Sequence, residues 1–153
     1  MSSGSTATQV FNAVHRHGVD AKRRIQIPSI WRPSEPSTQF TMIVWPQHRE
    51  GTCLRVLPPK ELAQLMESLD AMPNDPENKT VLKRIIGSES VQVTLDKAGR
   101  ICVPEEMVRA AGIEKEAVLV GLLDRFEIWN PAVYDRVKAA DRVMAQQALR
   151  MME

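Results

Sequence analysis

The feature that most constrains this chain is an internal repeat. Residues Val19–Pro28 align with Leu95–Pro104 at a spacing of 76 residues, and Asp, Arg, Ile and Pro coincide in register. Further along, residues 52–59 align with residues 124–131 at a spacing of 72. Two copies are too few for a solenoid, which needs at least about three stacked repeats to bury a continuous core. The sequence therefore predicts two related halves that form a pseudo-symmetric pair.

Each copy is predicted to run through the same series of elements: strand, tight turn, strand, short connection, two strands and a helix. In the second copy, apolar and polar residues alternate over Val91–Asp96, as in a half-buried strand. Gly99 can supply a positive φ for the turn that follows, and Pro104 closes the next strand because it has no backbone N–H to donate. Two further strands are expected on either side of Asp124.

Helices are expected where the spacing of apolar residues becomes helical. One is predicted from a stripe that ends at Pro73: Leu62, Leu65, Met66 and Leu69. Asp75-Pro76 and Asn130-Pro131 are helix-start signals, each an N-cap residue followed by Pro at the first helical position. A short helix is expected over residues 105–111, whereas the first copy has a breaker-rich loop over residues 33–37 instead.

Composition excludes several classes of protein. No window of the 153 residues approaches 18 consecutive apolar residues, so no membrane span is expected. The N-terminus lacks the basic and apolar regions of a secretory signal, and residues 1–9 are predicted to form a disordered tail. Cys53 and Cys102 are too few for a disulfide framework, and we expect both to be small buried hydrophobic residues in a reducing cytosol. Lys and Arg number 20 against 19 Asp and Glu, so any basic surface must come from local clustering.

A motif at the strand–turn–strand of each copy carries a family resemblance. It reads Asp-x-x-x-Arg-Ile-x-Ile-Pro from Asp20 and Asp-x-x-x-Arg-Ile-x-Val-Pro from Asp96. The second copy adds Arg-Phe-Glu-Ile-Trp at residues 125–129. Over about residues 10–140, these motifs together resemble the MraZ family, bacterial regulators within the AbrB-like swapped-hairpin DNA-binding proteins.

The resemblance implies an α+β fold with a mainly β core, a double-split β-barrel built from two pseudo-symmetric halves with peripheral helices. The halves are expected at residues 10–73 and 88–140, with a connecting helix at 74–87 and a C-terminal helix end and tail at 141–153. The resemblance also implies a homo-oligomer, a ring of chains, located in the cytoplasm and associated with the nucleoid. Its expected partner is double-stranded DNA at repeats upstream of its own operon of cell-division and cell-wall genes.

Carried over position by position, the motif predicts a DNA-binding site on the two hairpin loops. The residues expected to bind DNA are Lys22, Arg23, Arg24, Lys97 and Arg100. Residue chemistry supports this assignment, because residues 15–24 hold four basic residues against one acid, and Arg can bind guanine or phosphate through two parallel hydrogen bonds. The residues expected to organise the turns are Asp20, Asp96 and Gly99. A carboxylate repels phosphate, but it can accept backbone N–H bonds or orient the Arg.

Arg23 departs from the family pattern, which usually has Gly before the motif Arg, as at Gly99. If the first turn needs a positive φ at this position, a side chain there costs about 1–2 kcal/mol. Either the first turn has a different geometry, or an added phosphate contact compensates for the strain.

The sequence also bears on four other functions: catalysis, metal binding, an antitoxin role and a structural scaffold. The sequence has no nucleophile elbow, phosphate-binding glycine loop or His-Glu-x-x-His motif, so catalytic residues and a cofactor are not expected. His15 and His17 share a strand face, but with no third ligand nearby, solvated or phosphate-contacting histidines are favoured over a metal site. The remaining alternatives are an AbrB-like antitoxin, which usually has one hairpin copy, and a ring-forming scaffold without DNA binding.

Two sets of apolar residues are expected to serve packing. The tryptophans Trp31, Trp45 and Trp129 are interpreted as core or interface residues rather than as platforms for base stacking. The apolar residues of the C-terminal tail could pack on a neighbouring subunit: Met144, Leu149, Met151 and Met152.

Overall fold

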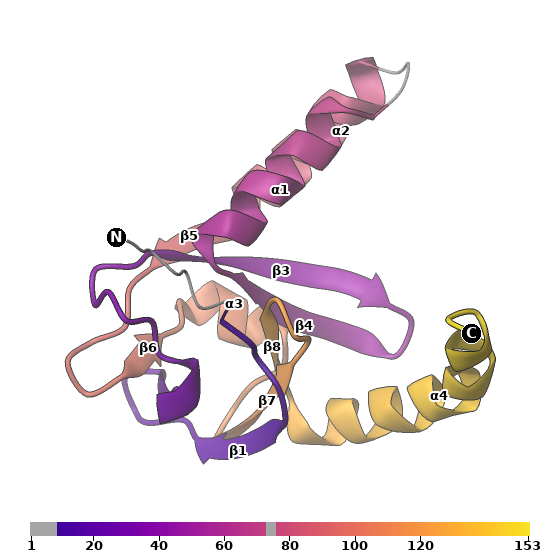
Figure 1. Ribbon diagram of the computed structural model, residues 1–153. Coiled ribbons are helices and arrows are strands. Elements are labelled where there is room, and N and C mark those ends of the chain that lie inside the picture. Colours follow the sequence, from indigo (N-terminus) through magenta and orange to yellow (C-terminus); the bar gives the residue numbers. More distant parts are fainter. Residues whose placement is uncertain (1–8, 73–75) are drawn as a thin grey trace, which may run out of the picture.

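The computed structural model describes residues 9–72 and 76–153, and it has an α+β fold of antiparallel strands and four α-helices (Figure 1). The predicted N-terminal tail lies outside the described residues apart from Gln9. The predicted end of the first helix at Pro73 and the predicted N-cap at Asp75 also lie outside them.

The two copies of the repeat fold into corresponding series of elements. The first series is β1 (Val14–Gly18), β2 (Arg24–Gln26), the 3-10 turn η1 (Ser29–Trp31), β3 (Phe40–His48), β4 (Gly51–Leu57) and α1 (Pro59–Asp70). The second series is β5 (Ser90–Val93), β6 (Arg100–Cys102), α3 (Glu105–Ala110), β7 (Glu116–Gly121), β8 (Phe126–Trp129) and α4 (Pro131–Arg150). Helix α2 (Pro76–Ser88) connects the two series, and η1 stands where the second copy has α3.

The strands of the two copies are interleaved rather than segregated. Six strands form one sheet in the order β1-β7-β8-β4-β3-β5, and β2 pairs with β6 in a separate two-stranded sheet. The first strand of each copy therefore pairs with the other copy, β1 with β7 and β5 with β3. The six-strand order reads the same after the two copies are exchanged, which is the arrangement expected of a pseudo-two-fold pair.

Two residue pairs mark the centre of this pseudo-symmetry. Ile25 faces Ile101 across the β2–β6 ladder, and these residues are 76 apart, which is the spacing of the first repeat segment. Arg55 faces Glu127 across the β4–β8 ladder, and these residues are 72 apart, which is the spacing of the second. Each pair thus joins a residue to its own counterpart, so the predicted pseudo-symmetric pairing is present in the sheet registers.

The main core lies between one face of the six-stranded sheet and the β2–β6 ladder. Ile25 and Ile101 are fully buried in it. Trp31 is also fully buried, with its ring centroid 5.1 Å from that of Phe126, and its indole N–H donates to the Asn12 carbonyl at 3.2 Å. The prediction that this tryptophan packs in the core is confirmed.

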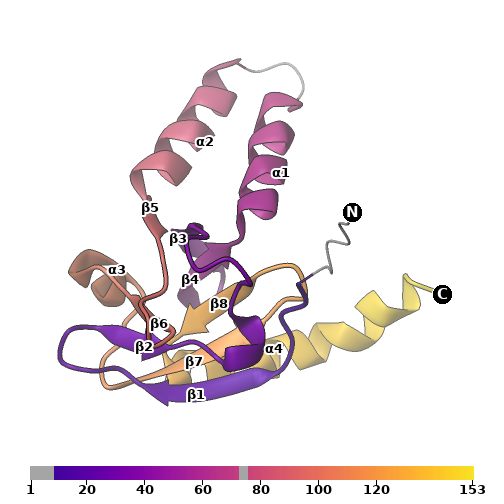
Figure 2. The ribbon, with the colours of Figure 1, turned by 60° about the vertical axis from the view of Figure 1, so that its left-hand side comes forward.

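The helices lie around this β core. Helices α1 and α2 form a hairpin that projects from the β3–β5 end of the sheet, and α4 extends away on the other side (Figures 1 and 2). The start of α4 matches its predicted signal, because the Asn130 side chain accepts the Val133 N–H at 3.0 Å and Pro131 is the first helical residue. Within the described residues, no helix is both long and apolar enough to cross a membrane.

A second, smaller core lies on the opposite face of the sheet. It holds Cys53, Val118, Trp129 and Val137, the last of which belongs to α4. The helix therefore covers the sheet face that turns away from the β2–β6 ladder. Burial of Trp129 confirms its predicted packing role.

One burial prediction is wrong: Cys102 is exposed, whereas Cys53 is buried as predicted. The reason is the period of a strand, since Ile101 and Val103 point into the core and the residue between them must point out. The double-split β-barrel stays a prediction, because the end strands β1 and β5 of the six-stranded sheet do not pair with each other in the described ranges.

Candidate nucleic-acid interface

The two motif turns have the same construction around an aspartate. In the first, Asp20 accepts the backbone N–H groups of Lys22 and Arg24 at 2.9 and 2.8 Å, and its second oxygen accepts Nε–H of Arg24 at 2.7 Å. In the second, Asp96 accepts the backbone N–H groups of Ala98 and Arg100 and the Nε–H of Arg100, each at 2.9 Å. Each carboxylate thus both fixes its turn and orients the motif arginine.

Both turns also share the backbone conformation that the family pattern predicts for glycine. The residue before the motif arginine has φ 79° at Gly99 and φ 61° at Arg23. In each turn this residue donates its N–H to the carbonyl of the motif aspartate at 2.9 Å. Of the two explanations offered for Arg23, a different turn geometry is therefore wrong, and the first turn carries a side chain in the left-handed region.

The β2–β6 ladder brings the two turns together. Arg24 pairs with Cys102 in the ladder, and Gln26 pairs with Arg100 (Figure 2). As a result, Nη1 of Arg100 lies 4.0 Å from the same Asp20 oxygen that accepts Arg24. The motif arginines of both copies therefore flank one carboxylate, although 76 residues separate them in the chain.

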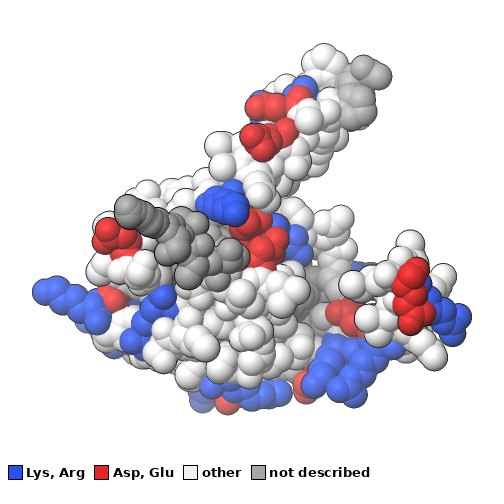
Figure 3. All heavy atoms as spheres, in the orientation of Figure 1, with Lys and Arg blue, Asp and Glu red and all other residues white. Residues whose placement is uncertain are grey.

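The basic residues of the turns lie at the surface. Lys22 and Lys97 are exposed, and the side chains of Arg24 and Arg100 keep 30% and 33% of their surface accessible. Figure 3 shows Lys and Arg side chains projecting at the edge of the molecule that holds the loop before β6. The structure thus brings all of the sequence-predicted site residues to one end of the molecule, around the β2–β6 ladder.

The electrostatics of the turns favour the charged form of both aspartates. The backbone N–H of Arg24 lowers the pKa of Asp20, assisted by the Arg24 side chain and by the N–H of Lys22. The backbone N–H and the side chain of Arg100 lower the pKa of Asp96 in the same way. Each ionised carboxylate accepts three N–H groups of its own turn and so holds the motif arginine in place.

The side chain of Arg23 has a contact that sequence reasoning missed. Its Nε–H donates to the carbonyl of Val103 at 3.0 Å, and its own carbonyl accepts the N–H of Val103 at 2.9 Å. Gln26 was missed as well, and it donates to the Ala98 carbonyl in the opposite turn at 2.9 Å. Both residues tie one turn to the other copy. A sequence pattern gives no signal for them because their partners depend on the β2–β6 pairing.

The two histidines of β1 lie on one face of the strand. His15 and His17 stack with ring centroids 6.4 Å apart, and in residues 9–72 and 76–153 no group of three or more candidate ligands is present. Burial and the neighbouring His15 lower the pKa of His17, which favours its neutral form.

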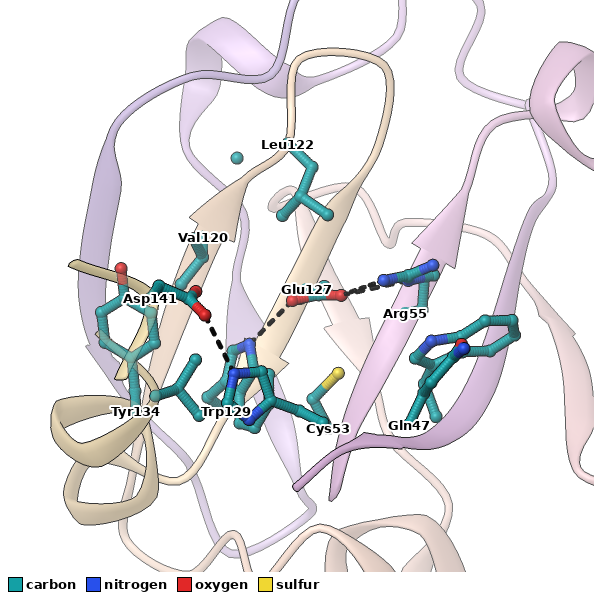
Figure 4. A pocket seen from close by; sticks show the side chains of 13 residues that line it. Gln47, Cys53, Arg55, Val120, Leu122, Glu127, Trp129, Tyr134 and Asp141 are labelled. Atoms are coloured by element: carbon teal, nitrogen blue, oxygen red, sulfur yellow. Dashed lines mark hydrogen bonds and ion pairs between the residues drawn. The ribbon is translucent and has the colours of Figure 1, made fainter. Parts of the chain in front are cut away.

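A second polar cluster lies on the far face of the sheet, in a cavity of about 460 Å³ beside α4 (Figure 4). Glu127 accepts Arg55 Nη2–H at 2.7 Å and the indole N–H of Trp129 at 2.9 Å. The guanidinium of Arg55 lies 4.4 Å from the ring centroid of Trp45. The opposite charges of Arg55 and Glu127 pair across the β4–β8 ladder, so this ion pair links the two copies of the repeat.

The fold and its paired hairpins define the class: a pseudo-symmetric α+β protein whose two copies exchange their first strands and present two arginine-bearing turns side by side. Comparison with known proteins then gives the family. Residues 86–152 match the family model described as "MraZ protein, putative antitoxin-like". Proteins named "Transcriptional regulator MraZ" from Pseudomonas putida (strain F1), Pseudomonas entomophila (strain L48) and Pseudomonas fluorescens (strain SBW25) are each 31% identical over 138 residues, 90% of this chain and 91% of theirs.

The chain belongs to the MraZ family of transcriptional regulators. The predicted resemblance is confirmed. The family name describes regulation of transcription rather than catalysis, in line with the expectation drawn from the sequence.

Proposed function

We propose that the protein binds double-stranded DNA upstream of its own operon and regulates that operon through the two hairpin turns. The observation that carries the proposal is the shared carboxylate arrangement, in which Arg24 and Arg100 are each held through Nε and meet at Asp20. An arginine oriented in advance loses less side-chain freedom on binding. The nearness of the two turns suits one continuous contact with DNA.

The chemistry of the turn residues suits two different contacts with DNA. An Nε–H held by an aspartate leaves the Nη groups of the arginine for a bidentate contact with guanine O6 and N7. The flanking Lys22 and Lys97 carry exposed point charges, which suit phosphate contacts that set register without reading sequence. The proposal therefore assigns base recognition to Arg24 and Arg100 and phosphate contacts to their neighbours.

We further propose that copies of the chain assemble into a ring in which each subunit forms the double-split barrel of the family. A near-neutral chain neutralises few phosphates, so a single copy should bind weakly. Linking weak sites raises affinity by about 10²–10⁴ when the sites can engage together. The end of α4 and the two residues that follow it offer exposed apolar side chains for such assembly: Val143, Met144, Leu149, Met151 and Met152. Successive repeats in the DNA would then bind successive subunits of the ring. We expect this binding to take place in the cytoplasm, at the nucleoid.

An antitoxin-like partner role is the second candidate, favoured by the antitoxin-like description of the matching family and by the same exposed apolar residues. In that case α4 would cover a toxin rather than another copy. The two candidates differ in what covers the exposed apolar residues of the C-terminal end, since only the ring requires the purified protein to form large assemblies by itself.

A footprint of the purified protein on the DNA upstream of its own gene, with sizing of the free protein alongside, tests the proposal. The expected result is a protected region of regularly spaced segments and a particle of several chains. Absence of protection at any concentration up to that of nonspecific binding would contradict the proposal. A monomer that protects DNA would leave DNA binding standing and remove the ring.

A further inference from the structure

Each motif turn is covered by an arginine side chain that binds an equivalent backbone carbonyl, but the two arginines come from different positions in the sequence. In the first turn, Arg23 Nε–H donates to the Val103 carbonyl at 3.0 Å. Around the second turn, Arg32 Nε–H donates to the Ile27 carbonyl at 3.2 Å. Ile27 and Val103 are counterparts, 76 residues apart, and each immediately precedes the proline of its motif. The carbonyl before the motif proline therefore accepts one arginine Nε–H in each copy.

The glycine of the second turn makes room for this arrangement. A side-chain carbon built at Gly99 would overlap Nε and Cζ of Arg32, so the guanidinium of Arg32 lies directly over the glycine. The counterpart of Gly99 is Arg23 itself, which brings its own guanidinium. The residue 76 positions after Arg32 is Val108, an apolar residue packed against the core, so that position brings no arginine to the first turn. The covering arginine of the first turn, Arg23, belongs to the turn itself, whereas that of the second turn, Arg32, comes from the loop after η1.

We propose that Arg32 is a further DNA-contacting residue, which takes at the second turn the role that Arg23 has at the first and completes the basic surface of the second turn. The inference rests on the proposed function. With Arg32 included, each turn carries three cations: Lys22, Arg23 and Arg24 around the first, and Arg32, Lys97 and Arg100 around the second.

The surroundings of Arg32 suit a phosphate group. Arg32 is exposed, and it lines an open groove of about 320 Å³ together with Lys97 and Gly99. Asp96 also lines this groove, but its oxygens are already engaged by three N–H donors of its own turn. Within residues 9–72 and 76–153, the only hydrogen bond of the Arg32 guanidinium uses Nε. Its Nη groups are therefore available for a phosphate oxygen.

The test measures binding of a labelled duplex from the upstream region by fluorescence anisotropy over a series of salt concentrations. Three variants are compared with the unchanged chain: Arg32→Gln, Arg32→Lys and the matched control Arg84→Gln. Arg84 is exposed on α2, in the hairpin that projects away from the turns (Figure 1). Loss of one phosphate contact should weaken binding roughly five- to tenfold at about 0.1 M salt and reduce the salt slope by about one.

We expect Arg32→Gln to show this loss equally on the upstream duplex and on a scrambled one. Arg32→Lys loses the Nε–H bond to the Ile27 carbonyl but keeps the positive charge, and because the charge is kept it should retain the salt slope. Arg84→Gln should match the unchanged chain. If Arg32→Gln keeps both affinity and slope, or if the two Arg32 variants lose thermal stability and affinity together with an unchanged slope, Arg32 is structural and the inference is wrong.

A double variant separates this inference from the proposed function. Arg24→Ala with Arg100→Ala should abolish specific binding if the turns form the DNA site. If that double variant binds as the unchanged chain does, the proposed function fails and the inference fails with it. If the double variant loses binding while Arg32→Gln does not, only the inference about Arg32 is overturned.

Discussion

The two motif turns of this protein have the same backbone conformation but partly different residues, and comparing them shows which contacts both copies of the repeat keep. Both turns keep the aspartate, the arginine it orients and the backbone hydrogen bonds. They differ between the aspartate and the arginine, and the difference that bears on the backbone is the residue before the arginine: Arg23 at φ 61° in the first turn and Gly99 at φ 79° in the second. The conformation is therefore common to both turns, while the source of the covering guanidinium is not.

The difference has an energetic side. A left-handed conformation costs a residue with a side chain about 1–2 kcal/mol. Arg23 offsets this cost through its partly buried hydrogen bond to the Val103 carbonyl, since bonds of this kind to charged groups contribute about 1.5–3 kcal/mol. Gly99 avoids the strain but has no side chain of its own to form that bond. The two solutions are thus of comparable stability, and substitutions can test whether they are equivalent.

The largest expected effect lies beneath the turns, at the central pair of the β2–β6 ladder. Ile25→Ala and Ile101→Ala each remove a fully buried side chain and should destabilise the fold by about 2–5 kcal/mol. Because the two residues are counterparts that face each other, the two losses should agree closely. Chemical denaturation of both variants measures this. A large difference between them would break the equivalence of the halves.

Gly99→Ala is expected to come next. The substitution places a side chain at φ 79° and displaces the guanidinium of Arg32, so it should destabilise the fold by at least about 1–2 kcal/mol. The matched control is Gly87→Ala in α2, where a new Cβ meets no atom within 4 Å and the gain in helix propensity should stabilise by roughly 0.5–1 kcal/mol. Denaturation midpoints of the two variants should therefore move in opposite directions. A Gly99→Ala chain as stable as the unchanged one would contradict the account.

The turn aspartates give a comparison in pH. The backbone N–H of the motif arginine lowers the pKa of Asp20 and of Asp96, so each carboxylate stabilises the fold above its unfolded pKa of about 3.9. This contribution is lost as the pH falls through the lower, folded value. Asp20→Asn and Asp96→Asn should therefore melt below the unchanged chain at pH 7, with the difference shrinking in strong acid.

A refinement of this comparison follows from the second arginine beside Asp20. Because Arg100 also lies 4.0 Å from the Asp20 carboxylate, Asp20→Asn should lower the melting temperature more than Asp96→Asn does. Thermal melts over a pH series record both effects. Differences independent of pH would show that the carboxylate charge has no part in holding the turns.

The smallest effect is expected for Arg23→Gly. The change relieves the left-handed strain but removes the hydrogen bond to Val103, so the free energy of unfolding should change by less than about 1 kcal/mol. DNA binding should weaken on all sequences and lose about one unit of salt slope if Arg23 contacts phosphate. A variant altered in neither stability nor binding would leave Arg23 without a role.

Much of this architecture could be predicted from the repeat itself. The turn at Gly99, the alternation before it and the helix start at Asn130 each depend on local chemistry that a sequence displays. The exposure of Cys102 was missed because an apolar run suggested burial, whereas a short two-stranded ladder buries only alternate residues. The contacts of Arg23 and Arg32 were missed because they depend on the folded path of the chain: Arg23 reaches Val103 across the ladder, and Arg32 turns back over η1 to Ile27, the residue after β2.

The central claim is that the two turns together form a DNA site, and the most direct test is the affinity of the Arg24→Ala, Arg100→Ala double variant for the upstream duplex. Each guanine contact is worth about 1–3 kcal/mol, so the double variant should lose several kcal/mol of specific binding. Its melting temperature should fall by only a few degrees, because the backbone N–H bonds to Asp20 and Asp96 remain and each partly exposed ion pair that is lost contributes about 1 kcal/mol or less. Anisotropy titration and thermal melting of the same preparation decide the matter. A stable double variant that binds the duplex as tightly as the unchanged chain would contradict the account.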